Sequence, residues 1–311
     1  MKWLLLILIP IFGACSTGPS SMEHGGRITA ELVPTKLVHS FHDASAVSFD
    51  QFLNFYVVEP SSNSVMKFSA SGDSIRCVSG FGSEHNQFNS PVDVDARLTN
   101  TVFIADNLNH RVEQYSKELS YVSTYFTRDS RTSEKRFGYP RAVAEDDAGN
   151  VYIADGENKR VLKIRPDYTV DRTIGGYGEA TRPEALLTNP IDIAVDRNER
   201  LIVLDHGGSS LVTFDDLGNL LARTELSGVG MSIAVANDTA FVLVAKDKSI
   251  QLYRSPDLAH IGSWKVDLDP STDPSTISGF AVRSGNVCLS TRQGVYLCKI
   301  RSVSADSHFP Y

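Results

Sequence analysis

A repeat of about fifty residues constrains this chain more than any other feature. The segment PVDVDARLTNTVFIADNLNHRV begins at Pro91, and related segments begin at Pro140 and Pro190, 49 and 50 residues further along. Fifteen positions after each proline an acidic residue ends the second apolar run: Asp106, Asp155 and Asp205. Because repeats of this length with short apolar runs are typical of propellers and solenoids, we consider a repeat architecture first.

The second copy shows what one unit contains. Residues 142–144, 151–154, 160–164 and 169–174 are short runs rich in β-branched and apolar residues, and turn-forming residues such as Asp147-Ala148-Gly149-Asn150 separate them. These patterns predict four strands joined by tight turns, and no segment sustains a helical period. Four antiparallel strands in one repeat are typical of a propeller blade.

The same copy resembles the NHL repeat, whose pattern is P-x-x-(I/V)-A-V-D-x-x-G-N-(V/L)-Y-(V/I)-A-D-x-x-N-x-R-(V/I). Residues 140–161 match it almost throughout, residues 91–112 nearly as well, and residues 190–211 without the arginine. The resemblance implies an all-β propeller of the NHL/TolB-like kind. It leaves the function open, because this scaffold hosts binding proteins and enzymes alike.

The remaining runs predict six blades. Strand patterns before the first proline, over 46–78, provide one blade, and degraded copies over 232–264 and 279–300 provide two more. The last copy has three strands, whereas one orphan strand, Lys36–Phe41, lies near the N-terminus. We expect this strand to complete the last blade, since ring closure avoids unpaired strand edges. The prediction is one six-bladed domain over residues 31–303.

The first residues resemble a bacterial lipoprotein signal. A basic start precedes a short apolar run, which ends in Phe12-Gly13-Ala14-Cys15. We expect residues 1–14 to be removed, Cys15 to carry lipid, residues 15–30 to form a flexible tether and residues 304–311 a tail. An ordinary secretory peptide is the alternative. Ser16 after the cysteine resembles an outer-membrane address, so the expected location is the bacterial cell envelope, in the periplasm or at the cell surface.

Charge and cysteine content narrow the classes of function. Lys plus Arg number 30 and Asp plus Glu number 37, a net charge of −7. This acidity disfavours a nucleic-acid partner, and we expect a monomer.

Cys288 and Cys298 lie on the two arms of a predicted hairpin and form either a disulfide or two buried thiols. We favour the thiols, because a register offset by one residue points the side chains to opposite faces.

Long predicted connections gather on one face of the disc, over residues 79–90, 126–139, 175–189 and 267–277. Long loops on a rigid scaffold are the usual place for function. The candidate contacts on this loop-rich face are His85, His110, Arg160 and His206. The recurring Asp106, Asp155 and Asp205 are instead interpreted as turn caps that pair with Arg111 or Arg160.

The start of each inner strand is expected at the mouth of the central channel. These positions are the second set of candidate ligand-binding residues: Ser45, Asp93, Arg141, Asp192, Ser232 and Ser278. Asp93 and Asp192 with Arg141 could hold a cation or a polar ligand there; the alternative is the ordinary polarity of a water-filled channel.

We therefore expect a binding or scaffold module for a protein, peptide or glycan partner, without a cofactor beyond a structural cation. The alternative is a metal-dependent lyase or lactonase working in the channel, as six-bladed relatives imply. That enzyme would need His85, His110, His206, Asp93 and Asp192 to converge on one metal.

Overall fold

The computed structural model describes residues 28–303 except 99, 128–129, 179–181, 206–208, 245–246 and 268–275. Cys15 and His206, two of the residues singled out above, lie outside the described residues, as do the expected signal peptide and C-terminal tail.

Strands dominate the described chain, and they form four four-stranded antiparallel sheets and one eight-stranded sheet. The four smaller sheets are β2 (Ala46–Phe49), β3 (Phe55–Glu59), β4 (Ser64–Phe68) and β5 (Ser74–Ser79); β6 (Pro91–Asp95), β7 (Thr101–Asp106), β8 (Arg111–Ser116) and β9 (Tyr121–Tyr125); β10 (Pro140–Glu145), β11 (Val151–Asp155), β12 (Arg160–Ile164) and β13 (Val170–Ile174); and β14 (Pro190–Val195), β15 (Leu201–Asp205), β16 (Ser210–Phe214) and β17 (Leu220–Glu225).

The eight-stranded sheet runs in the order β18 (Gly230–Ala236), β19 (Thr239–Val244), β20 (Ser249–Arg254), β21 (Ala259–Val266), β1 (Ile28–Ser40), β24 (Gly294–Ser302), β23 (Asn286–Thr291) and β22 (Ile277–Arg283). Among the described residues, three short 3₁₀ helices lie in the connections: η1 (Asn107–Asn109), η2 (Ser133–Lys135) and η3 (Pro183–Ala185).

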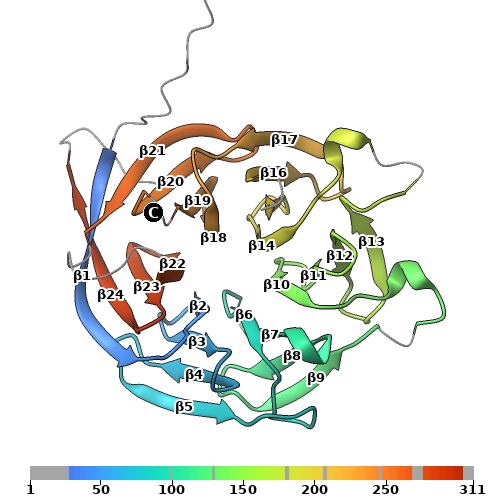
Figure 1. The fold of residues 1–311 in the computed structure, drawn as a ribbon, viewed down its shortest axis with the longest axis horizontal. Helices are drawn as coiled ribbons and strands as arrows, with labels where there is room; N and C mark the ends of the chain where they lie inside the picture. The colour runs from blue at the N-terminus through green and yellow to red at the C-terminus, as the bar shows by residue number, and fades with distance from the viewer. Residues whose placement is uncertain are drawn as a thin grey trace, which may run out of the picture.

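The sheets stand around a central opening, so the molecule is a β-propeller (Figure 1). The innermost strands β2, β6, β10, β14, β18 and β22 contact one another in a closed ring, in which β22 returns to β2. Each inner strand begins on the face that carries the long connections and ends at a tight turn on the opposite face. The Pro–Asp spacing of the repeat appears as a paired register: Pro91 faces Asp106, Pro140 faces Asp155 and Pro190 faces Asp205.

Local chemistry explains the tight turns. In the turn between β10 and β11, the Asp146 carboxylate accepts hydrogen bonds from the backbone N–H of Ala148 and of Asn150, and from the Asn150 side chain. Gly149 has a φ of +81°, a conformation that glycine adopts without a steric penalty. The turn residues read from the sequence therefore place the strands where they were predicted.

Hydrophobic clusters fill the spaces between neighbouring sheets. Between β10–β13 and β14–β17, Tyr152, Val161 and Leu187 pack against Val203 and Phe214, all of them almost inaccessible to solvent. Because each sheet is covered on both faces, its middle strands are buried along most of their length and rich in apolar residues, as in the fully buried FYVVE of β3. Full burial of one such side chain contributes about 1.5–3 kcal/mol.

Strand β1 joins the two halves of the eight-stranded sheet. It pairs antiparallel with β24 from Ala30↔Ser302 to Ser40↔Gly294, and parallel with β21 from Ile28↔Ser263 to Leu32↔Val266. The expected pairing of Lys36–Phe41 with the last hairpin is present, but the strand begins earlier. Residues 28–30, expected in the tether, belong to β1 because Ala30 and Leu32 pack in a buried cluster with Trp264.

Cys288 and Cys298 are buried free thiols. Val287 faces Cys298 and Cys288 faces Leu297, so the two cysteines are offset by one residue and point to opposite faces of the sheet. Cys298 joins the cluster toward β18–β21, and Cys288 joins the cluster toward β2–β5. Burial raises the pKa of both thiols, that of Cys298 to about 12.

A candidate binding site in the central channel

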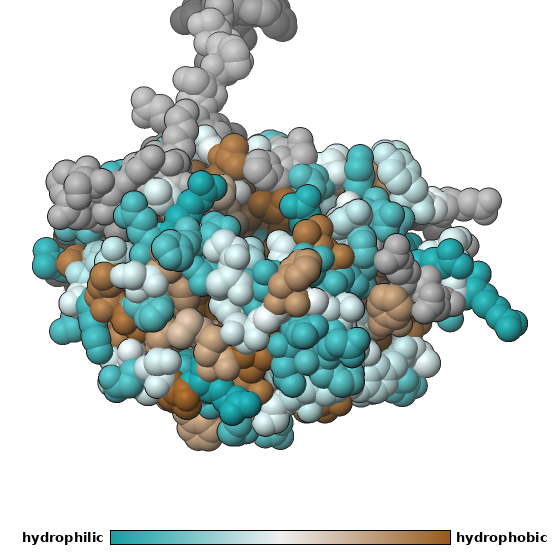
Figure 2. Space-filling model, turned by 60° about the horizontal axis from the view of Figure 1, so that its bottom comes forward, coloured by the Kyte–Doolittle hydropathy of each residue, from teal (hydrophilic) through white to brown (hydrophobic). Residues whose placement is uncertain are grey.

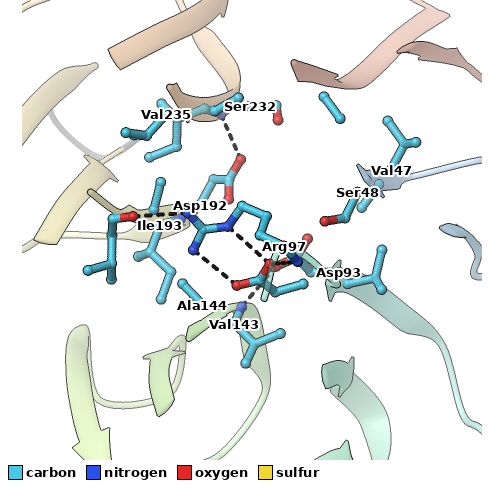
Figure 3. Close-up of a pocket in the computed structure, with 18 of the residues that line it drawn as sticks. Val47, Ser48, Asp93, Arg97, Val143, Ala144, Asp192, Ile193, Ser232 and Val235 are labelled. Atoms are coloured by element: carbon cyan, nitrogen blue, oxygen red, sulfur yellow. Dashed lines mark hydrogen bonds and ion pairs between the residues drawn. The ribbon is translucent and has the colours of Figure 1, made fainter. Parts of the chain in front are cut away.

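A cavity of about 650 Å³ occupies the centre of the ring, and each of the six inner strands or the residue before it contributes to its lining. The six mouth residues predicted from the sequence all line this one cavity: Ser45, Asp93, Arg141, Asp192, Ser232 and Ser278. Figure 3 shows several of these side chains in the lumen.

Two aspartates tie inner strands together. The Asp93 Oδ2 of β6 accepts a hydrogen bond from the Val143 N–H of β10 at 2.8 Å. The Asp192 Oδ2 of β14 accepts one from the Ile233 N–H of β18 at 2.7 Å, and the Ser232 hydroxyl also bonds Asp192. Each carboxylate therefore fastens its strand to the next one around the ring.

Burial shifts both carboxyl groups in the same direction. Desolvation raises the pKa of Asp192 to about 6. Desolvation also raises the pKa of Asp93 well above its usual range, and the Asp192 charge raises it further. Among the described residues neither carboxylate has an ion-pair partner. The pair favours protonation or the approach of a cation.

Arg141 lies differently from the two aspartates. It stands one position after the repeat proline, whereas Asp93 and Asp192 stand two positions after it, so the residues are not equivalent along the strand. Its side chain runs past Gly156, where an added β-carbon would lie 3.0 Å from Cγ and 3.2 Å from Nε of Arg141. Arg141 lines the same cavity as both aspartates, and its joint role with them stays a prediction.

The other end of the channel is crossed by Arg97, which the sequence analysis missed. Its guanidinium donates to both Asp95 oxygens at 3.0 Å, to the Val195 carbonyl at 2.9 Å and to the Glu145 carbonyl at 3.2 Å. The Arg97 carbonyl in turn accepts from Arg283 at 2.8 Å. Figure 3 shows the Arg97 side chain extending across the lumen. It links the ends of β6, β10 and β14.

A signal for Arg97 exists in the repeat. Six positions after the proline, the second and third copies carry the turn aspartates Asp146 and Asp196, but the first copy carries Arg97. An arginine cannot accept the N–H groups of such a turn. The arginine at this position of the repeat therefore indicates that residue 97 does not cap its turn and has a different structural role.

The recurring aspartates at the ends of β7, β11 and β15 are buried caps, as predicted. Asp106 binds the Arg111 Nε at 2.8 Å, and Asp155 binds the Arg160 Nε at 2.9 Å. Arg160 is consequently buried, and the structure does not offer it as a surface contact. In the third copy Ser210 replaces the arginine.

Arg223 from β17 supplies the missing charge beside Ser210. Its Nη1 donates to the Ser210 hydroxyl at 2.8 Å and lies 3.4 Å from Asp205. A neighbouring strand therefore restores the buried ion pair that the third copy of the repeat lost.

The two described histidines of the loop-rich face lie outside the cavity lining. His85 stacks on Tyr121 of the outer strand β9, with ring centroids 4.0 Å apart. The His110 Nδ1 accepts a hydrogen bond from the Tyr139 N–H at 3.1 Å. Neither joins Asp93 and Asp192, and the described part of the chain contains no group of three or more residues arranged to hold a metal ion.

The loop-rich face exposes several large apolar side chains. Phe81 is 73 % exposed and Tyr177 is 81 % exposed, and Leu108 and Tyr139 are also exposed. Asn109 bonds the Gly82 carbonyl, so the turn that carries Leu108 touches the loop that carries Phe81. Figure 2 shows apolar side chains distributed among hydrophilic ones on the face that it draws.

Comparisons with known proteins agree with the repeat. No family model matches the chain. The chain is 26% identical over 146 residues to "Protein brain tumor" of Drosophila melanogaster, covering 46% of this chain and 13% of that protein. It is 27% identical over 113 residues to "NHL repeat-containing protein 3" of Homo sapiens, covering 34% of this chain and 32% of that protein. The chain thus spans less than a third of the length of these relatives.

Solved propellers share the fold. A streptogramin B lyase structure aligns with a TM-score of 0.63 at 10% identity, covering 88% of this chain and 98% of that one. The WD40 repeats of RRP9 align with a TM-score of 0.58 at 11% identity, covering 82% and 79%. At these identities the likeness concerns the fold alone. Together with the matched repeats, the comparisons support an NHL-type β-propeller.

Proposed function

We propose that this chain is a six-bladed propeller that serves as a binding or scaffold module through its loop-rich face. The count takes the eight-stranded sheet as two blades, β18–β21 and β22–β24 with β1. The closed ring of inner strands supports it. The partner is a protein, a peptide or a glycan; the net charge of −7 disfavours a nucleic acid.

One observation carries the binding proposal: exposed apolar side chains and long connections gather on the face where the inner strands begin. Aromatic side chains on a rigid scaffold give contact area at a small entropic cost. The opposite end of the channel is crossed by Arg97, which leaves the loop-rich face as the side from which a partner reaches the cavity.

A matched pair of variants tests this assignment. Phe81→Ser with Tyr177→Ser alters the loop-rich face. Phe52→Ser with Leu217→Ser alters the opposite face, where the two side chains are 69 % and 60 % exposed. Partner capture from a cell-envelope extract, quantified by mass spectrometry, should fall several-fold for the first pair only. Equal capture by both pairs would place the contact elsewhere.

We also propose that Cys15 carries lipid and that residues 15–27 tether the propeller to a membrane of the cell envelope, with the outer membrane as the expected address. The sequence around Cys15 supports this. No helix among the described residues is long and apolar enough to cross a membrane. Fatty-acid labelling of the full chain should disappear in Cys15→Ser; labelling that persists would exclude this cysteine.

A further inference from the structure

The central cavity holds two carboxylates, Asp93 and Asp192, that have no ion-pair partner among the described residues. Asp95 in the same wall pairs with Arg97, and Asp196 pairs with an arginine of its own turn. Within the part of the chain that the structure describes, Asp93 and Asp192 instead receive only backbone N–H and hydroxyl hydrogen bonds. Each of them is partly exposed to the cavity. Buried carboxylates are ordinarily paired. Glu145 and Asp147 of the same wall also lack an ion pair among the described residues, but they lie beside Arg97 or beyond it, so Asp93 and Asp192 are the unpaired carboxylates of the loop-rich end.

Three of the four basic side chains that line the cavity are engaged elsewhere, and the fourth, Arg141, is exposed. Four arginines line the cavity against seven carboxylates. Arg97 is held by Asp95 and two carbonyls, Arg283 donates to the Arg97 carbonyl, Arg197 donates to Asn237, and Arg141 lies beside Gly156. Val195, which receives Arg97, is three residues beyond Asp192, roughly 10 Å along the strand. The end of the cavity wall that carries Asp93 and Asp192, away from Arg97, is therefore acidic.

The cavity suits a long side chain better than a bare ion. Its volume of about 650 Å³ far exceeds the space that one ion needs. Val143, Ile193 and Ile233 also line it, and they offer an apolar surface to methylene groups. No third metal-ligating side chain joins Asp93 and Asp192 among the described residues.

We propose that the cavity receives a lysine or arginine side chain of a protein or peptide partner, whose cationic group is held between Asp93 and Asp192. This assignment rests on the proposed binding function and names the chemistry of its partner. The ammonium or guanidinium group donates to the carboxylate oxygens, and the side chain enters from the loop-rich face because Arg97 crosses the other end (Figure 3).

Proton linkage gives this site a signature. The free carboxyl groups have raised pKa values, that of Asp192 about 6. A bound cation lowers both values, so binding releases protons. The groups that face the pair electrostatically are Asp95, which disfavours its ionisation, and Arg97, which favours it. We expect the affinity to fall as the pH drops through about 6.

The test uses two acetylated, amidated pentapeptides, Gly-Gly-Lys-Gly-Gly and the same peptide with norleucine, titrated into the folded protein. We expect saturable binding of the lysine peptide only. It should weaken about tenfold or more in Asp93→Asn with Asp192→Asn, since one charged hydrogen bond contributes about 1.5–3 kcal/mol. Asp147→Asn removes one negative charge from the same wall beyond Arg97 and so matches each single asparagine variant; its affinity should stay within about twofold.

Several results would overturn the assignment. Equal binding of the norleucine peptide would show that the cationic group is not recognised. An unchanged affinity in the double variant would place the peptide elsewhere, as would an affinity that does not fall between pH 7.5 and 5. The site would be assigned to a metal if calcium or zinc ions displaced the peptide at a concentration below the peptide's own dissociation constant, and if this displacement required both aspartates. If the double variant does not fold, each single asparagine variant is titrated instead.

The two proposals fail in different ways. If the partner captured by the wild type is retained by Asp93→Asn with Asp192→Asn but lost by Phe81→Ser with Tyr177→Ser, the loop-rich face binds and the cavity does not. If both pairs of variants lose the partner, the cavity and the face act together.

Discussion

Carboxylates in this propeller occupy two kinds of environment, one with an ion-pair partner and one without, and the repeat pattern does not distinguish them. Asp155 is buried, accepts a hydrogen bond from the Gly138 backbone N–H of the preceding connection and pairs with Arg160. Asp192 is held by N–H groups and a hydroxyl but has no positive partner within the described residues. Removing one member of a buried pair such as Asp155–Arg160 costs about 3–5 kcal/mol. The aspartates of the channel instead make the ionised protein less stable.

The channel pair predicts a pH-dependent gain in stability from Asp93→Asn with Asp192→Asn. Because both folded pKa values are raised, protonation of the two groups stabilises the fold at low pH. That contribution is lost as the pH rises through the folded pKa values, and the folded pKa of Asp192 is about 6. The double variant should therefore be more stable than the wild type at pH 8 in urea unfolding, and the difference should shrink toward pH 5. A difference that stays constant with pH would show that the carboxyl groups are not desolvated.

At the scale of elements, strand β1 decides how the ring closes. It was predicted to pair with the last hairpin, and its register with β24 agrees. Its first eight residues were not predicted, because they carry no copy of the repeat and contain Pro34. They pair on both edges, with β21 and β24, and such a long-range parallel contact leaves no periodic trace in the chain.

The repeat likewise predicted which strand starts line the cavity, because the inner strand comes first in every copy. It could not predict Arg97, whose partners lie at the ends of β10 and β14. The orientation of Arg141 was also beyond reach, since it depends on a turn of the neighbouring strand. Positions repeated in register were thus predictable, and contacts between copies were not.

Two leucines of β1 offer a direct test of its role. Leu32 is fully buried in the cluster with Trp264, whereas Leu37 is 49 % exposed. Leu32→Ala should lower the free energy of unfolding by about 2–5 kcal/mol, since it leaves a cavity. Leu37→Ala should cost under about 1 kcal/mol. If chemical denaturation showed that Leu32→Ala lowers the free energy of unfolding no more than Leu37→Ala does, the first part of β1 would add no packing to the closed ring.

For the whole molecule, the ring couples every interface between sheets to its two neighbours. Cys288 and Cys298 lie on opposite faces of one sheet, in the clusters that face β2–β5 and β18–β21. Neither thiol can meet solvent unless the packing on its side is broken, whereas Cys77 on the outer strand β5 is exposed. The two buried cysteines therefore report separately on the two sides of the segment that closes the ring.

We expect a thiol reagent to label Cys77 in the native protein and to leave Cys288 and Cys298 unlabelled. In Cys15→Ser with Cys77→Ser, both buried thiols should become reactive at the same urea concentration, which should coincide with the loss of the β-sheet signal in circular dichroism. The reason is that a ring cannot open on one side of a sheet without freeing strand edges and apolar surface on the other. Labelling of Cys298 well before Cys288 would show instead that the contact of β1 with β21 opens first and that the ring does not unfold as one unit.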